Sequence, residues 1–391
     1  MIAGVVVLVD STVGARRPDS GQVTQRPTLA KGLELGVPKR ITDRVALYPR
    51  AVRLAHSGPY NGRIIVSVVS HDGREGTGEI FESADDGATF SHLATIADPQ
   101  ATDGRGLCCG TLFEVPRRTG PTAEGTLLWA ASVGQSALPR AMALRVWRSD
   151  DHGRTWTYLS SCARTRSSRG IWEPELSVDS AGRLVCHFSD ETQPGHSQVL
   201  ARVASTDGGY TWGGKVNTVV GRSSTDRPGM AVVRRLPYGI YVMSYEICSA
   251  PESRRCAVHF RTSADGWNWN GPDLMPESVR QAHFEHAPTI AWAPGPGMFG
   301  RLFLIGQVLA LRSGEVVSSS GNVLLTNDQR GSGAWSETSA PLDTPVPARD
   351  ACSNYSSALL PSTDGSRLLE IGTRYDADGV CRAYFATAGL R

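Results

Sequence analysis

One eight-residue pattern recurs along the 391-residue chain and constrains its fold more than any other feature. Each full copy places Asp two residues after Ser, Gly two residues after Asp and Thr two residues after Gly, and it ends in an aromatic residue. Asp can accept hydrogen bonds from the amides of its own turn, and Gly allows a backbone conformation that other residues disfavour. The pattern predicts β-turns anchored by their aromatic side chains, with Trp156 and Trp212 buried beneath them. Full copies occupy 83–90, 149–156 and 205–212, with a contracted copy at 263–269 and a degenerate one at 326–335.

A second repeat, out of phase with the first, consists of short apolar segments, several with Pro near their start. They begin near residues 47, 109, 172, 227, 286 and 354, about 60 residues apart. The 42 Gly and 23 Pro residues suit many turns between short strands. Together the repeats predict an all-β chain: a six-bladed β-propeller of four-stranded antiparallel blades. Two separate β-sandwiches are the alternative, but no linker supports them.

We expect residues 1–391 to form a single propeller domain. Residues 1–40 would be an N-terminal extension that takes part in closing the ring, because the C-terminal strand at 383–387 is expected to share a blade with N-terminal residues. The apolar run 2–9 is either an edge strand or the remainder of a trimmed signal peptide.

The charge of the chain is nearly balanced, with 40 basic and 38 acidic residues. Such a balance gives no strong field toward nucleic acid or a membrane surface, so we expect neither as a partner. We expect a monomer. The nine His residues show no paired-ligand spacing, and we expect no metal and no cofactor.

The eight cysteines suit an oxidising compartment, so we expect a secreted protein. Cys248 with Cys256 and Cys352 with Cys381 could each close a loop. Adjacent Cys108 and Cys109 are expected to point to opposite faces of a strand rather than to bond to each other.

Candidate catalytic residues follow from the propeller prediction, since the first strand of each blade lines the channel. Glu173 and Glu175 flank Pro174 at one first strand, and alternation along a strand would place them on one face. Glu246 ends the second strand of the next blade. One carboxylic acid can protonate a glycosidic oxygen while another attacks or activates water, so carboxylates gathered with Arg and Tyr suit glycoside hydrolysis. The competing interpretation is that such residues form ion pairs between blades.

Five motifs in this part of the chain resemble glycoside hydrolase family 93. They are Gly170-Ile-Trp172-Glu173-Pro174-Glu175, Phe188-Ser-Asp190-Glu191, Arg227-Pro-Gly-Met230, Met243-Ser-Tyr245-Glu246 and Cys352-Ser-Asn354-Tyr355-Ser.

The resemblance spans residues 40 to 391 and implies a six-bladed exo-α-1,5-L-arabinanase. Such an enzyme releases arabinobiose from the non-reducing end of linear arabinan with retention of configuration. It also implies that Glu173 and Glu246 are the catalytic glutamates and that Tyr355 is an active-site tyrosine. For substrate contacts we select Arg50, Trp172, Glu175, Asp190, Glu191, Arg227, His286 and Asn354.

Two other functions fit the same predicted fold. An exo-α-sialidase would need three arginines around a carboxylate, which Arg50, Arg227 and Arg374 could supply, with Tyr355 as nucleophile. A noncatalytic carbohydrate-binding propeller would need aromatic platforms such as Trp172 and Trp292, but not two glutamates at adjacent blade ends.

Overall fold

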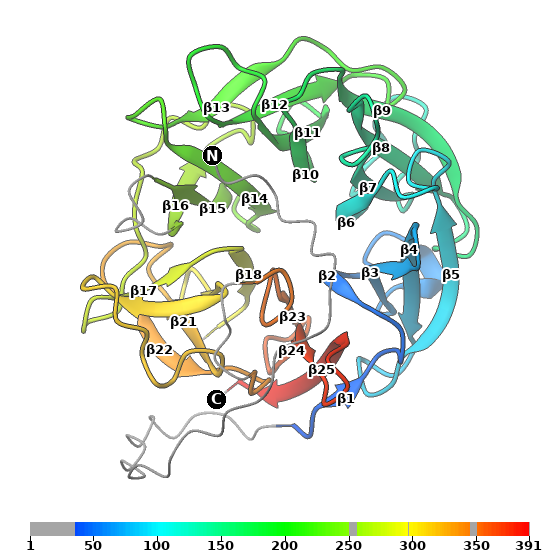
Figure 1. The fold of residues 1–391 in the computed structure, drawn as a ribbon. Helices are drawn as coiled ribbons and strands as arrows, with labels where there is room; N and C mark the ends of the chain where they lie inside the picture. Colours follow the sequence, from blue (N-terminus) through cyan, green and yellow to red (C-terminus); the bar gives the residue numbers. More distant parts are fainter. Residues whose placement is uncertain (1–35, 250–255, 296, 345–349, 391) are drawn as a thin grey trace.

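The computed structural model describes residues 36–249, 256–295, 297–344 and 350–390. In these residues six antiparallel sheets surround a central axis (Figure 1), and the only helix is one 3-10 turn at Gly58–Tyr60. The predicted all-β, six-bladed propeller is confirmed. No helix of the described part is long and apolar enough to cross a membrane. The apolar run 2–9 lies outside the described residues.

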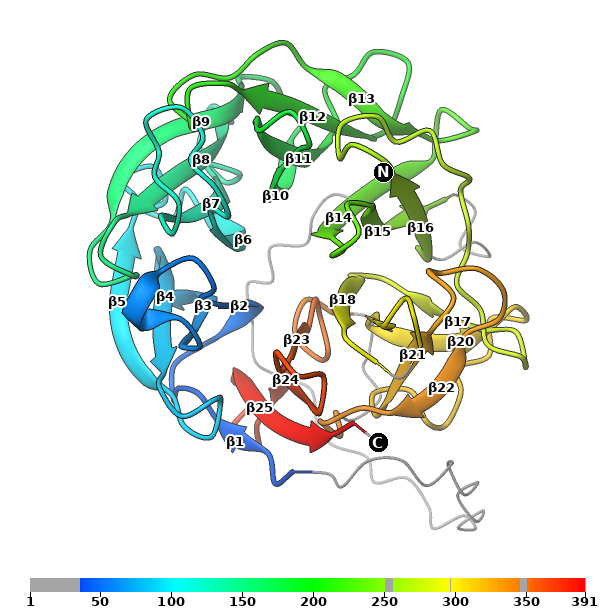
Figure 2. The same ribbon diagram turned by 180° about the vertical axis from the view of Figure 1, so that it is seen from behind.

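Within each blade the first strand lies nearest the axis, and later strands lie further out (Figures 1 and 2). Blades one to three are β2 (Leu47–Arg53), β3 (Ile64–Asp72), β4 (Glu75–Ser83), β5 (Ser91–Ala97); β6 (Leu107–Glu114), β7 (Leu127–Val133), β8 (Met142–Ser149), β9 (Thr157–Thr165); and β10 (Ile171–Val178), β11 (Leu184–Asp190), β12 (Val199–Ser205), β13 (Val216–Val220). Blades four to six are β14 (Arg227–Arg235), β15 (Tyr241–Cys248), β16 (Ala257–Ser263), β17 (Ala282–Glu285); β18 (Thr289–Ala293), β19 (Arg301–Ile305), β21 (Val323–Asn327), β22 (Ser336–Ser339); and β23 (Ala358–Pro361), β24 (Arg367–Tyr375), β25 (Cys381–Gly389), β1 (Lys39–Arg40).

The ring is closed by the two ends of the described chain. β1 pairs with β25, so that Lys39 lies opposite Phe385 and Arg40 opposite Tyr384. The amide of Ile41 also donates to the carbonyl of Ala383. The N-terminal strand thus completes the C-terminal blade, as the sequence predicted.

Blade four departs from the four-strand pattern. Its sheet has five strands, because β17 also pairs with β20 (Val308–Leu311), which lies in the connection between β19 and β21 of blade five. This shared pairing joins blades four and five through backbone hydrogen bonds.

The turns formed by the eight-residue pattern connect the third and fourth strands of a blade. In the second copy, Asp151 accepts hydrogen bonds from Ser149 Oγ (2.8 Å), Thr155 N (2.9 Å) and Thr155 Oγ1 (2.6 Å). In the second copy, Ser149 Oγ accepts a hydrogen bond from Gly153 N. Asn327 Oδ1 accepts the equivalent bond from Gly331 N in the degenerate fifth copy. The fifth copy therefore starts at Asn327, one residue after the expected start at 326.

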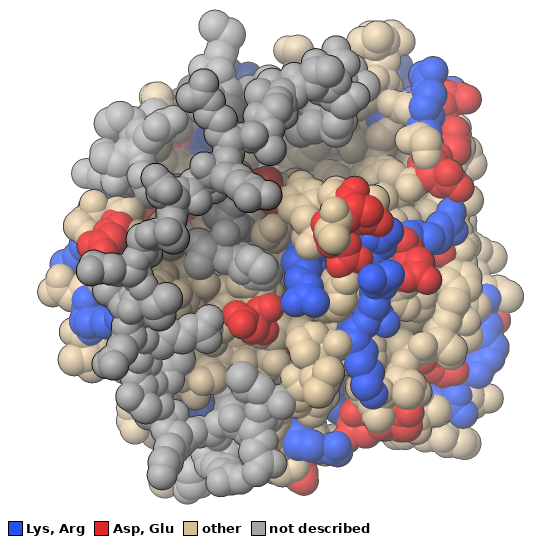
Figure 3. Space-filling model, turned by 60° about the horizontal axis from the view of Figure 1, so that its bottom comes forward, with Lys and Arg blue, Asp and Glu red and all other residues tan. Residues whose placement is uncertain are grey.

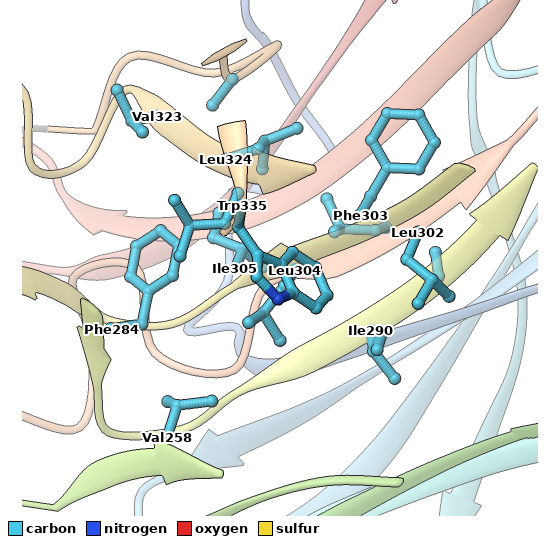
Figure 4. Packing of buried hydrophobic residues seen from close by; sticks show 14 of the residues in the cluster. Val258, Phe284, Ile290, Leu302, Phe303, Leu304, Ile305, Val323, Leu324 and Trp335 are labelled. Carbon is cyan, nitrogen blue, oxygen red and sulfur yellow. The ribbon is translucent and has the colours of Figure 1, made fainter. Parts of the chain in front are cut away.

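The aromatic anchors differ in burial from the prediction. Trp156 and Trp212 are only partly buried, and each indole N–H donates to a nearby oxygen, Gly153 O and Ser160 Oγ respectively. Trp269 and Trp335 are buried, with 3% and 1% of their surface exposed. Figure 4 shows Trp335 among Leu304, Ile305 and other side chains of the largest core cluster.

All eight cysteines form disulfides. Cys248–Cys256 and Cys352–Cys381 match the expected pairs. Cys162–Cys186, which was not anticipated, links β9 to β11. The expectation for Cys108 and Cys109 was wrong, because they bond to each other.

The face in Figure 3 carries basic and acidic side chains beside one another rather than in separate fields. Many basic and acidic residues of the described part form ion pairs, as Arg382 does with Asp376 and Asp378. The near-zero net charge is therefore also locally balanced on this face.

The burial difference predicts unequal stability losses. Trp335→Ala should lower the free energy of unfolding by about 3–5 kcal/mol, the range for large core aromatics. Trp156→Ala should cost clearly less, because its ring already contacts water. Urea unfolding of the two variants beside the parent protein measures both values, and equal losses would contradict this account of the anchors.

Candidate active site

Every blade carries a non-glycine residue with positive φ at the start of its first strand or just before it. The next residue is Pro, Gly, Ala or Ser. In blades one to four this residue begins a β-bulge, since the register with the second strand shifts there by one residue. Such strained backbone is most often found at functional sites. The six residues are Tyr48 (φ 52°), Cys109 (61°), Glu173 (58°), Met230 (55°), Ala287 (49°) and Ser356 (59°). Blades five and six each have a second such residue, His286 (61°) and Asn354 (54°).

These bulge positions come together around the axis. Tyr48, Met230 and Ala287 belong to one buried cluster, against which Cys109 and Tyr355 also pack. Closure of the ring therefore brings residues of five blades to one place.

Glu173 is fixed within this group from three directions. Its amide donates to Ser132 Oγ of blade two (3.1 Å). Its carboxylate accepts from Ser189 Oγ (2.6 Å) and from the amide of Met230 (3.1 Å). Burial raises the pKa of Glu173, while these two donors and the charge of Arg227 oppose the rise.

Gly229 provides the space for this arrangement. A Cβ at this position would lie 2.7 Å from Gln198 Nε2, 3.1 Å from Ser189 Oγ and 3.4 Å from Glu173 Oε2. Any larger residue would displace the groups that hold the Glu173 carboxylate.

Glu246 lies opposite Gly229 in the pairing of β15 with β14. Its carboxylate accepts from the amide of Ala287 (2.7 Å) and lies 3.4 Å from Cys248 Sγ. Burial and the negative charge of Glu173 raise the pKa of Glu246 to about 8, despite the opposing effects of Ala287 and Arg227. Glu246 therefore holds a proton near neutral pH.

Tyr355 completes the central group. Its hydroxyl donates to Met230 Sδ (3.4 Å), and its ring centroid lies 6.4 Å from that of Tyr48. Burial raises its pKa well above the usual value, and the charges of Glu246 and Glu173 add to this effect. The structure thus brings the three predicted catalytic residues together.

Two of the predicted substrate contacts form a partly exposed ion pair beside this group. Arg227 Nη2 lies 2.5 Å from Glu191 Oε1 and also donates to Gln198 Oε1 (2.7 Å). Burial alone would raise the pKa of Glu191, but the hydrogen bonds from Arg227 and Gly170 have the larger combined effect and lower this pKa below its usual value. Trp172 is partly buried, and the guanidinium of Arg140 lies 5.0 Å from its ring. His286, next to Ala287, has a nitrogen within 4.8 Å of a Glu246 oxygen.

Glu175 is held between blades rather than beside Glu173. It accepts from Thr111 Oγ1 (2.9 Å) and from Arg234 Nη1 (2.8 Å). The expectation that Glu173 and Glu175 share a face was based on strict alternation, and the bulge at Glu173 breaks that alternation.

Three other selected residues are bound mainly within the protein scaffold. Asp190 is fully buried, accepts from Thr192 and forms an ion pair with Lys215. Arg50 is buried, donates to the carbonyls of Pro49 and Ser356, and stacks on Tyr48.

Asn354 is the third, and it connects blade six to the loop after β19. Its amide nitrogen donates to the carbonyls of Gly306 (3.0 Å) and Gln307 (3.1 Å).

One set of potential metal ligands adjoins the site: Glu246, Cys248, Cys256 and His286, with ligand atoms within 4.8 Å of one another. Both sulfurs are in the Cys248–Cys256 disulfide. Metal ions bind thiolates rather than disulfide sulfurs, so this set fits a metal poorly in the oxidised protein.

Sequence reasoning missed the groups that tune Glu173. Ser189 and Met230 lie inside motifs that we noted. The contact of Ser189 with Glu173 depends on the bulged pairing of β10 with β11, and that of Met230 on the packing of blade four against blade three. Ser132 belongs to no motif, and nothing in the sequence marks it.

No family model and no curated protein matches the chain. Among solved structures, it is similar to the α-L-arabinanase of Penicillium chrysogenum complexed with arabinobiose. The TM-score is 0.75 and the identity 24%, over 92% of this chain and 98% of that one. It is also similar to the family 93 α-L-arabinofuranosidase of Fusarium graminearum with arabinobiose, with a TM-score of 0.75 and 22% identity over 91% and 97% of the two chains. These comparisons show that the chain has the fold of these propellers.

The raised pKa of Glu246 predicts a pH-dependent stability difference. A carboxyl group whose pKa is higher in the folded state takes up a proton on folding, so stability falls as pH rises from about 4.5 to about 8. Glu246→Gln should therefore stabilise the protein at pH 8 to 9 by up to a few kcal/mol, because one pKa unit is worth about 1.4 kcal/mol. Near pH 4.5 it should have little effect. Thermal unfolding across this pH range measures the difference.

Glu370 on β24 provides a matched comparison. It is also buried, accepts a hydrogen bond from the amide of Leu342 (3.0 Å), and burial raises its pKa to about 8. Glu370→Gln should show the same pH-dependent gain in stability. If neither variant gains stability at alkaline pH, the two buried glutamates are not protonated as described.

Proposed function

We propose that the protein is an exo-acting glycoside hydrolase that cleaves α-1,5-linked L-arabinan from the non-reducing end and releases arabinobiose with retention of configuration. The observation that carries the proposal is a pair of glutamates in unequal surroundings, of which Glu246 is buried and Glu173 partly buried. Glu246 has a pKa raised to about 8, whereas Glu173 accepts two hydrogen bonds that favour its ionised form. Two carboxyl groups set apart in this way suit the acid and nucleophile of a glycosidase.

The likeness to propellers solved with arabinobiose supports the choice of substrate. At 22–24% identity this likeness is evidence about the fold, so the sugar class comes from the combination of fold, motifs and site.

In the first step, protonated Glu246 donates its proton to the glycosidic oxygen as the C–O bond breaks. A Glu173 carboxylate oxygen attacks the anomeric carbon and forms an ester bond with the sugar. In the second step, Glu246, now ionised, takes a proton from water, and the water oxygen displaces Glu173. Both carboxyl groups return to their starting states.

The ordering of the two roles follows from the donors around each carboxyl group. Ser189 Oγ and Met230 N stabilise negative charge on Glu173, as a nucleophile requires. Burial and the adjacent Glu173 charge keep the proton on Glu246. When Glu173 is consumed in the ester bond its charge is lost, so the pKa of Glu246 falls and it becomes the base of the second step.

Tyr355 remains neutral, because burial and the charges of Glu246 and Glu173 raise its pKa. Among the described residues its hydroxyl is held only by the thioether sulfur of Met230, a weak acceptor, so it can turn to a carboxylate or a sugar oxygen when substrate enters. We assign it the positioning of the nucleophile and substrate.

The other two functions are less well supported. A sialidase needs three convergent arginines, but Arg50 is bonded to backbone carbonyls and Arg374 stacks on Tyr384 (4.0 Å). A noncatalytic lectin gives no reason for a protonated glutamate beside a hydrogen-bonded one in a buried site.

We further propose that the protein is secreted. Four disulfides support this, since such bonds form and persist in oxidising compartments.

Replacing either glutamate should abolish arabinan hydrolysis without unfolding the protein. Glu173→Gln should lower kcat by several orders of magnitude on every substrate, because no nucleophile remains. Glu246→Gln should lower it as far on arabinan but much less on an aryl arabinoside with an acidic leaving group, because that group needs little protonation. Steady-state kinetics on both substrates separate the roles.

Glu370→Gln is the control for loss of a buried carboxyl group and should retain arabinan hydrolysis. Added azide should rescue Glu246→Ala to give the arabinosyl azide of retained configuration, and Glu173→Ala to give the inverted one. The opposite pattern would exchange the two roles, and substantial arabinan hydrolysis by both Gln variants would overturn the proposed function.

A further inference from the structure

The disulfide between neighbours Cys108 and Cys109 occupies the blade-two position that Glu173 occupies in blade three. Cys109 is the positive-φ residue of the blade-two bulge, and it packs against the cluster that contains Tyr48 and Met230. Both cysteines are partly exposed. Cys109 therefore packs beside the bulge residues of blades one and four, and part of the disulfide is exposed.

A strand pairing and a side-chain hydrogen bond connect this disulfide to the backbone of Glu173. Cys108 lies opposite Ser132 in the pairing of β6 with β7. The hydroxyl of Ser132 accepts the amide hydrogen of Glu173 (3.1 Å). One residue, Ser132, thus separates Cys108 from the backbone of Glu173, which we assign as nucleophile.

Stabilisation of the fold is a weak explanation for this bond. A disulfide stabilises chiefly by closing a loop of the unfolded chain, and the effect grows with the length of that loop. Here the bonded residues are adjacent, so the loop is minimal. The Cys162–Cys186 bond, 24 residues apart and between two blades, serves that purpose far better.

The bond instead creates a particular surface. Linking neighbouring side chains fixes both of them and the backbone between them, and divalent sulfur is apolar and polarisable. Gly110 then allows the bulge to lie against Trp129, since a Cβ there would be 3.0 Å from the indole. The result is a rigid sulfur surface supported by a buried tryptophan.

We propose that the Cys108–Cys109 disulfide is a sugar-contacting surface of the active site, on which the C–H face of the arabinofuranosyl ring beside Glu173 packs. This assignment rests on the proposed function, because it takes the ligand to be an arabinose oligosaccharide. Binding sites for small molecules combine such apolar walls with a few polar groups, here the two glutamates and Tyr355. The disulfide is a specificity-determining element and takes no part in bond cleavage.

Binding of arabinobiose to the catalytically inactive Glu173→Gln variant tests the assignment directly. Adding Cys108→Ala and Cys109→Ala together should weaken the affinity measured by titration calorimetry at least about tenfold. Adding Cys162→Ala and Cys186→Ala instead, which removes the disulfide between β9 of blade two and β11 of blade three, should leave the affinity unchanged. Unchanged affinity in a folded Cys108/Cys109 variant overturns the proposal.

A second measurement leaves the disulfide in place and does not depend on the cysteine variants folding. A phosphine reductant with an alkylating agent labels Cys108 and Cys109 as their bond opens, and mass spectrometry follows the label. Saturating arabinobiose should slow this labelling at least severalfold in the Glu173→Gln variant, whereas glucose at equal concentration should not. Labelling that arabinobiose does not slow overturns the proposal.

Different results would overturn the proposed function and the role given to the disulfide. If the parent protein does not hydrolyse arabinan and the Glu173→Gln variant does not bind arabinobiose, the proposed function fails, and the sugar class given to the disulfide fails with it. If hydrolysis and binding are present but insensitive to the state of Cys108–Cys109, only the present inference is overturned.

Discussion

Packing of two carboxyl groups, buried Glu246 and partly buried Glu173, against the same short segment, Gly229 and Met230, is the interaction on which the rest of the site depends. The Glu173 carboxylate accepts a hydrogen bond from the Met230 amide. Glu246 lies opposite Gly229 in the pairing of β15 with β14. Burial and the adjacent charge of Glu173 raise the pKa of Glu246, so one proton remains on Glu246 near neutral pH. Glu173 accepts from two donors that stabilise its charge, Ser189 Oγ and Met230 N, whereas Glu246 accepts from one, the amide of Ala287.

The propeller makes this burial possible through a repeated backbone feature. Each first strand begins with a positive-φ residue, and closure of six blades directs these residues to one axis. Blade three uses the position for Glu173, blade four for Met230 and blade two for one half of a disulfide. One backbone conformation is thus retained while the chemistry of each position differs. Glu370 shows that burial alone is insufficient: its pKa is raised as far as that of Glu246, but it only supports a loop amide.

The sequence was sufficient for the fold because its signals are local. A turn of the eight-residue pattern needs only its own Ser, Asp, Gly and Thr. Five copies of this pattern, together with six first strands, define the number of blades. Glu173, Glu246 and Tyr355 could be predicted from motifs at blade ends. The surroundings of Glu175 could not, because a single extra residue in the bulge changes the face on which a side chain lies. The disulfide of Cys108 and Cys109 was missed for the same reason, and the scaffold contacts of Asp190 depend on Lys215, which is distant in sequence.

In the proposed mechanism, Glu173 is the residue that becomes covalently attached to the sugar. Incubation with a 2-deoxy-2-fluoro-arabinofuranosyl donor that carries a good leaving group should accumulate this ester, because fluorine slows its hydrolysis. Peptide mass spectrometry should then find one sugar equivalent on Glu173, within the peptide that also contains Glu175. Fragmentation that places the sugar on Glu175, or a label on Glu246 or Tyr355, would contradict the central assignment.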